Sequence, residues 1–145
     1  INARLGHTAT RLANGQVLVV GGASSGPEGY LASADLFDPA TNRWTAAANL
    51  NHARGGHTAT LLRDGQLLVV GGKDNTQVLA SAERYEPALN RWVDAASPRI
   101  ARWLHTAALL PGGQVLVAAG KGEADALATT ERYDPAANTW AASAP

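Results

Sequence analysis

The chain has 145 residues, of which 46% are hydrophobic, so it can bury a core and disorder is not expected. Twelve basic and twelve acidic residues cancel, which excludes recruitment to nucleic acid or an anionic membrane by net charge alone. The absence of cysteine excludes disulfides, thiolate metal sites and a cysteine nucleophile.

The longest apolar runs, such as residues 67–70 and 115–119, are too short to cross a bilayer. We therefore expect a soluble chain with neither a nucleic-acid nor a membrane partner. The chain lacks methionine and begins at Ile1, so we expect it to be processed, excerpted from a longer protein or engineered. The compartment stays undetermined, with a preference for a secreted or cell-surface location.

The first unit, residues 1–48, contains landmarks that recur later in the chain. In order they are Arg4, a His-Thr-Ala triplet at His7, Asn14-Gly15, Gly21-Gly22, Phe37 followed by Pro39, and Asn42 with Trp44. An Asn-Gly pair suits the positive φ angles of a tight hairpin, so it predicts a strand on each side.

The second unit, residues 49–97, predicts four strands in an antiparallel meander, with Asp64-Gly65 as the first hairpin turn. The expected strands are residues 57–62, 66–70, 82–85 and 91–93. The second of them is wholly apolar, as a strand covered on both faces should be, whereas the third and fourth mix charge with aromatics. This gradient orders the strands from the centre of an assembly to its rim.

The third unit, residues 98–145, repeats the pattern, and the three tryptophans Trp44, Trp92 and Trp140 are 48 residues apart. Its landmarks are Arg102, His105, Gly112-Gly113, Ala119-Gly120, Tyr133 followed by Pro135, and Asn138 with Trp140. No segment has helical periodicity. The sequence therefore predicts an all-β repeat protein with almost no helix.

These landmarks resemble the kelch repeat: an arginine before the first strand, a double glycine after the second, then tyrosine and tryptophan about seven residues apart. The resemblance implies a β-propeller built of four-stranded antiparallel blades. Three blades lie in this chain, which would be half of a six-bladed ring.

Two residues depart from the repeat. Phe37 stands in place of the tyrosine, which should keep the packing but lose a hydroxyl hydrogen bond. Ala119 stands in place of the first glycine, which suggests that this position in the third blade needs no positive φ.

Three blades form an open arc, because propellers close with roughly four to eight. The outer faces of the first and last blades must then be covered. Two partners are expected: the remaining blades of a longer chain, or a second copy in a head-to-tail homodimer.

The resemblance implies that Arg4, Arg54 and Arg102 sit at one mouth of the ring and contact ligands. A guanidinium group suits carboxylate or phosphate recognition because its planar fork pairs with two oxygens. Alternatively, each arginine bonds a carbonyl or an acid of the neighbouring blade. Since all three units carry the residue, the sequence favours this structural duty.

The loops after the double glycines, residues 23–30, 73–78 and 121–126, differ most between units, and variable loops on a repeated scaffold often carry specificity. Their candidate ligand contacts are Tyr30, Lys73, Asp74, Asn75 and Lys121. Trp103 breaks the repeat and is a further candidate, as a stacking surface for sugar or peptide or as a core filler.

Equivalent histidines of adjacent blades lie too far apart to share one metal ion, so we interpret His7, His57 and His105 as structural and predict no metal site. His52 is expected in a surface loop. The acidic pairs of the third strands are expected at solvated or inter-strand positions; they are Glu83 with Glu86 and Glu131 with Asp134.

No catalytic constellation is visible, since the chain has no Gly-x-Ser-x-Gly elbow. Some kelch relatives resemble galactose oxidase, whose copper cofactor needs a cysteine, and this chain has none. We therefore expect no cofactor and a non-catalytic module for protein or peptide binding or scaffolding. The alternatives are a carbohydrate-binding or glycan-modifying propeller and an engineered or minimal half-propeller whose role is assembly.

Overall fold

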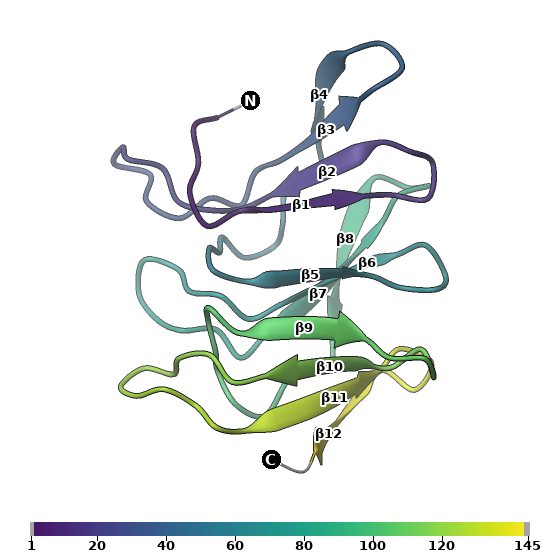
Figure 1. Cartoon of the computed structure of the whole chain (residues 1–145). Helices are drawn as coiled ribbons and strands as arrows, with labels where there is room; N and C mark the ends of the chain where they lie inside the picture. Colours follow the sequence, from purple (N-terminus) through teal and green to yellow (C-terminus); the bar gives the residue numbers. More distant parts are fainter. Residues whose placement is uncertain (1, 144–145) are drawn as a thin grey trace.

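The computed structural model describes residues 2–143, which form three four-stranded antiparallel sheets (Figure 1). Blade 1 consists of β1 (Thr8–Arg11), β2 (Val17–Val20), β3 (Ala34–Asp38) and β4 (Arg43–Ala47). Blade 2 consists of β5 (Thr58–Leu61), β6 (Leu67–Val70), β7 (Ala82–Glu86) and β8 (Arg91–Ala95). Blade 3 consists of β9 (Thr106–Leu109), β10 (Val115–Ala118), β11 (Thr130–Asp134) and β12 (Thr139–Ser143).

Each blade is a meander in which the strands pair in chain order, as the sequence predicts. The strands of blade 2 agree with the predicted ranges to within two residues at either end. The first hairpin of every blade turns through a glycine with positive φ, at Gly15, Gly65 and Gly113. The turns lie where the Asn-Gly, Asp-Gly and Gly-Gly pairs predict them, but the expected positive φ is found only at the second residue of each pair.

The blades stack face to face through their apolar strands. In β6, Leu67 and Val69 belong to the hydrophobic cluster shared with blade 1, whereas Leu68 and Val70 belong to the cluster shared with blade 3. This division follows from the two-residue period of a strand. The central blade therefore contributes to both cores.

The inner edges of the blades adjoin one another, because β1 contacts β5 and β5 contacts β9 (Figure 1). Blades 1 and 3 are the two ends of the stack. In β10, Val115 and Val117 are buried against blade 2, while Leu116 and Ala118 on the other face are only half-buried. The end faces are thus less covered than the two internal junctions.

Residues 2–143 contain no helix, and so no helix long and apolar enough to cross a membrane. One sequence-based expectation about the backbone is wrong. Ala119 has a φ of 58°, close to the 60° of Gly21 and the 63° of Gly71. The position needs the left-handed conformation in all three blades, and the third blade adopts it with an alanine.

Candidate functional site

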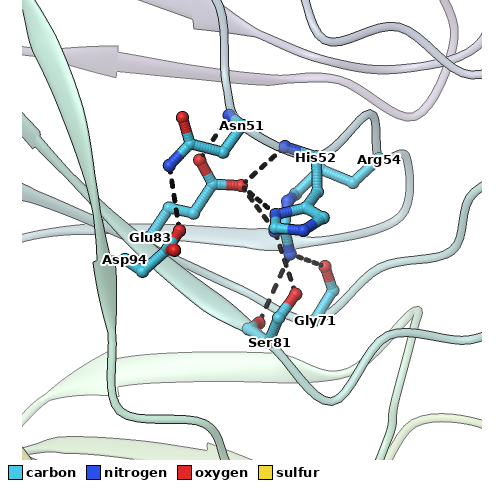
Figure 2. A network of polar contacts seen from close by, with 7 residues as sticks. All are labelled: Asn51, His52, Arg54, Gly71, Ser81, Glu83 and Asp94. Atoms are coloured by element: carbon cyan, nitrogen blue, oxygen red, sulfur yellow. Dashed lines mark hydrogen bonds and ion pairs between the residues drawn. The ribbon is translucent and has the colours of Figure 1, made fainter.

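Arg54 lies fully buried at the start of blade 2, where its guanidinium group joins three segments (Figure 2). Nη1 donates to the carbonyl oxygens of Gly71 (2.7 Å) and Ser81 (3.3 Å). Nη2 donates to the hydroxyl of Ser81 (3.1 Å) and to Oε1 of Glu83 (2.7 Å). Burial lowers the pKa of Arg54, and the charge of Glu83 opposes this effect.

The same network recurs in the other two blades. The Nη2 atoms of Arg4 and Arg102 form ion pairs with Asp35 (2.6 Å) and Glu131 (3.0 Å). Their Nη1 atoms donate to carbonyl oxygens at equivalent places, Gly21 and Ser33 in blade 1, and Ala119 and Thr129 in blade 3. Each arginine therefore fastens the end of its own blade's second strand to the third.

Glu83 also holds the connection between blades 1 and 2. Its two oxygens accept hydrogen bonds from the backbone N–H groups of Asn51 (2.7 Å) and His52 (3.1 Å). Glu131 accepts from Arg99 (2.7 Å) and Ile100 (3.3 Å) in the same way. Of the two positions expected for these acids, solvated or inter-strand, the solvated one is wrong, because a buried arginine requires a buried counter-charge.

Ligand binding by Arg4, Arg54 and Arg102 stays a prediction, and the arginine networks make it more demanding. Both Nη atoms of each side chain already donate within the blade, so an anion would have to compete with a carboxylate of the protein. The acids could have been found in the sequence: Glu83 and Glu131 each follow their arginine by 29 residues.

Two of the three repeated histidines are buried at the junctions. Nε2 of His57 lies 3.0 Å from Oγ1 of Thr8, and Nε2 of His105 lies 2.9 Å from Oγ1 of Thr58. Burial, followed by the charge of Arg54, lowers the pKa of His57 to about 3. Burial, followed by the charge of Arg102, lowers the pKa of His105 to about 4. Both act as neutral, structural hydrogen-bonding groups.

Within residues 2–143, ligand atoms of His52, Glu83 and Asp94 lie within 4.8 Å of one another (Figure 2). Glu83 is already paired with Arg54 and bonded to two backbone N–H groups. Asp94 accepts a hydrogen bond from Nδ2 of Asn51 (2.9 Å), and the His52 side chain is 53% exposed, as expected of a surface loop. Since its central carboxylate is neutralised by arginine, this group is a poor cation site.

The structure brings together Tyr30, Lys73 and Trp103, which come from three different blades. The ammonium group of Lys73 lies 4.9 Å from the centroid of the Trp103 ring and 5.7 Å from that of Tyr30. All three side chains are half-buried. They lie at the loop end of the blades, which we define as the end formed by the segments after the double glycines, and form a cation–π cluster there.

Short β-bridges hold this loop end in place. Lys73 pairs with Gly55 and with Val78, and Lys121 pairs with Trp103 and with Ala126. The Lys121 side chain is exposed. The loops are therefore extensions of the blades with fixed backbones, and two lysines occupy equivalent positions on neighbouring blades.

The remaining two loop candidates, Asp74 and Asn75, form hydrogen bonds that fix the loop conformation. Desolvation tends to raise the pKa of Asp74, but hydrogen bonds from Thr76 and Gln77 lower it overall. These bonds, at 2.7 to 2.8 Å, close the turn. Asn75 accepts from the N–H of Tyr30 (3.2 Å) and donates to the carbonyl of Glu28 (3.2 Å), so it links the loops of blades 1 and 2.

The sequence did not predict two grooves at the opposite end of the blades, which we call the hairpin end because the β1–β2, β5–β6 and β9–β10 turns lie there. One, with a volume of about 630 Å³, lies between blades 1 and 2 and includes Leu12, Gln66 and the exposed Leu89. The other, of about 440 Å³, lies between blades 2 and 3. Neither has a motif of its own, because each forms only where hairpin turns of adjacent blades meet.

Comparison with known families gives a match to a repeat family. The family model of the Kelch motif matches residues 4–51 and 54–99, which include every strand of blades 1 and 2. Comparison with curated proteins gives no match. Blade 3, outside the matched residues, has the same strand order and the same arginine network as the other two.

Proposed function

Because this chain belongs to the kelch family, we propose that it is a non-catalytic binding module whose ligand surface is the loop end of its blades. The ligand is a peptide or protein segment with a carboxylate side chain. The sheets act as a scaffold that holds loops of three blades in one place.

The observation that carries this proposal is the convergence of Tyr30, Lys73 and Trp103. Side chains distant in the sequence meet at one end of a rigid framework, partly exposed and outside both hydrophobic cores. Binding sites are commonly built in this way, from variable loops on a repeated scaffold.

The charge of the cluster favours an acidic ligand. Lys73 and the exposed Lys121 offer two ammonium groups on neighbouring blades, and Trp103 and Tyr30 offer apolar ring surface beside them. A carboxylate that reaches Lys73 would form an ion pair with an ammonium group that already lies against two aromatic rings. The buried arginines and acids are engaged in ion pairs within the blades, which supports a binding role over a catalytic one.

The proposal is tested by probing the purified chain with arrays of acidic, basic and neutral peptides, and with a glycan array in parallel. We expect acidic peptides to bind, Lys73→Glu to abolish binding and Trp103→Ala to weaken it about ten-fold or more. Arg11→Ala is the matched control, since Arg11 is an exposed cation on β1 outside the loop end. Equal binding by Lys73→Glu would contradict the proposal, and binding of glycans alone would favour the carbohydrate alternative.

A further inference from the structure

We propose that the uncovered faces of blades 1 and 3 bind each other in a second copy of the chain, so that two copies close a six-bladed ring. This inference is independent of the ligand surface. It rests on contacts that occur twice inside the chain, at the junction of blades 1 and 2 and at the junction of blades 2 and 3. At the two ends of the stack, the groups that make these contacts are present but lack their partners.

The histidine contact is the first of these. At the internal junctions His57 meets Thr8 and His105 meets Thr58. The same series leaves His7 on blade 1 and Thr106 on blade 3, and both are exposed. Neither side chain has a hydrogen-bond partner within residues 2–143. A second copy would supply Thr106 to His7.

Backbone hydrogen bonds form a second series. The N–H groups of Gly22 and Gly72 donate to the carbonyl oxygens of Arg54 and Arg102, both at 2.8 Å. Continuing the series would join the N–H of Gly120 to the carbonyl of Arg4 in the second copy.

A neighbouring series runs along the inner edge. The N–H of Gly56 donates to the carbonyl of Gly6 (2.9 Å), and the N–H of Leu104 donates to the carbonyl of Gly56 (2.7 Å). Its continuation would join the N–H of Gly6 in the second copy to the carbonyl of Leu104. Each end thus carries the complement of the other.

The aromatic pairs give the fourth series. Tyr85 and Trp92 are 1% and 7% exposed, because they pack against blade 1. Phe37 and Trp44 form the same pair, with ring centroids 5.0 Å apart against 5.1 Å, yet Trp44 is 42% exposed. No other blade in the described part of the chain, residues 2–143, covers this pair.

The far face of blade 3 has room for such a pair. Tyr133 of blade 3 packs with Leu68 and Val70 of blade 2. The equivalents of these two residues in blade 3 are Leu116 and Ala118, which are only half-buried. A groove of about 470 Å³ lies on blade 3, and Thr130 and Ser143, which pair across β11 and β12 on the same face as Ala118, contribute to its lining. Phe37 and Trp44 of a second copy would occupy this face.

A second copy fits the two faces, because both halves of every repeated contact lie on one chain. Further blades of a longer chain are the alternative occupant, and a chain that sediments as a monomer would favour them. Contacts between different faces form rings when the rotation closes and open filaments when it does not. Two copies of three blades give six, within the range of about four to eight at which propellers close.

Ala119 distinguishes the new junction from the internal ones. A Cβ atom added to Gly21 or Gly71 would lie 2.4 or 2.3 Å from the carbonyl oxygen of Arg54 or Arg102 across the junction. Ala119 carries that atom at the equivalent place, with the same left-handed backbone. It would press on the carbonyl of Arg4 in the second copy, so the intermolecular junction must be looser than the internal ones.

The test is sedimentation velocity of the whole chain over a range of concentrations. We expect a reversible particle of about 30 kDa, twice the 15.0 kDa chain. Ala119→Gly should lower the dissociation constant about ten-fold or more by removing the crowding. Trp44→Ala should raise it by a similar factor, while the exposed apolar control Leu89→Ala, at the hairpin end, leaves it unchanged.

Crosslinking tests the register directly, because the native chain has no cysteine. A short bis-maleimide should join the double variant His7→Cys/Thr106→Cys into a dimer, whereas each single variant should stay uncrosslinked. Both substituted residues are exposed, so folding should be preserved. A monomer at millimolar concentration for both the native chain and Ala119→Gly would overturn the proposal, as would a crosslinked ladder of larger species.

Discussion

The Arg54 guanidinium group and the Glu83 carboxylate form a fully buried ion pair, with 2.7 Å between Nη2 and Oε1. The pair joins the carbonyl after β6, the start of β7 and the connection from blade 1 (Figure 2). A single pair thus fixes the geometry within blade 2 and the position of blade 2 beside blade 1.

Removing one partner should be strongly destabilising. Arg54→Ala leaves the Glu83 carboxylate buried without its counter-charge, and such changes cost about 3–5 kcal/mol. Urea unfolding followed by circular dichroism measures the loss. The matched control is Arg91→Ala, which breaks the pair between Arg91 and Glu86 on the surface and should cost less than about 1 kcal/mol. Equal losses for the two variants would contradict the assignment.

Acid should destabilise the chain through His57 and His105. Their folded-state pKa values, about 3 and about 4, lie below the ordinary 6.5, so the unfolded chain binds protons first as the pH falls. The stability due to neutral imidazoles is therefore complete above about pH 6.5 and is lost below it. The free energy of unfolding should decrease by up to about 1.4 kcal/mol per pH unit for each histidine.

The measurement is urea unfolding between pH 7 and pH 4.5. His57→Gln should flatten the profile, because glutamine does not titrate, even though the variant is less stable throughout. His52→Gln is the control, since this histidine is exposed and lies outside both hydrophobic cores. If His57→Gln keeps the full slope, the acid sensitivity has another origin.

Phe37→Tyr should stabilise the chain. The hydroxyl groups of Tyr85 and Tyr133 donate to Oδ1 of Asn90 (2.9 Å) and Asn138 (2.7 Å), as the sequence comparison of the units indicated. Asn42 is the equivalent acceptor in blade 1, with the same positive φ. Restoring this bond should add about 0.5–1.5 kcal/mol, and Tyr85→Phe should remove a similar amount. Thermal unfolding of the two variants provides the comparison.

The fold could be predicted because the same strand and turn signals occur in each of the three repeats. The hairpin glycines, the apolar β6 and the tyrosine and tryptophan of each blade are local signals, and the strands lie where these signals indicate. The number of blades followed from counting the repeats. Local chemistry and repetition together determine this level of structure.

The site was harder to predict because it depends on contacts between units. Tyr30, Lys73 and Trp103 were each singled out, but the sequence could not show that Lys73 lies over both rings. The strand pattern leaves a solvated and an inter-strand position open for Glu83, because it does not reveal which face is covered. The expectation for Ala119 is wrong because an alanine at a glycine position does not show that the position lacks a positive φ. The alanine can adopt that φ itself.

Strand β6 contributes side chains to both hydrophobic cores, and this determines how the chain should unfold. Since Leu67 and Val69 belong to one core and Leu68 and Val70 to the other, blade 2 cannot open without exposing both. Blades 1 and 3 each lose only one core on opening, so they should fray first in a stack of repeats coupled to nearest neighbours. Amide hydrogen exchange should accordingly be slowest in β6 and reflect global unfolding there. The central blade thus links the two cores, and its opening coincides with global unfolding even though the end blades can open before it.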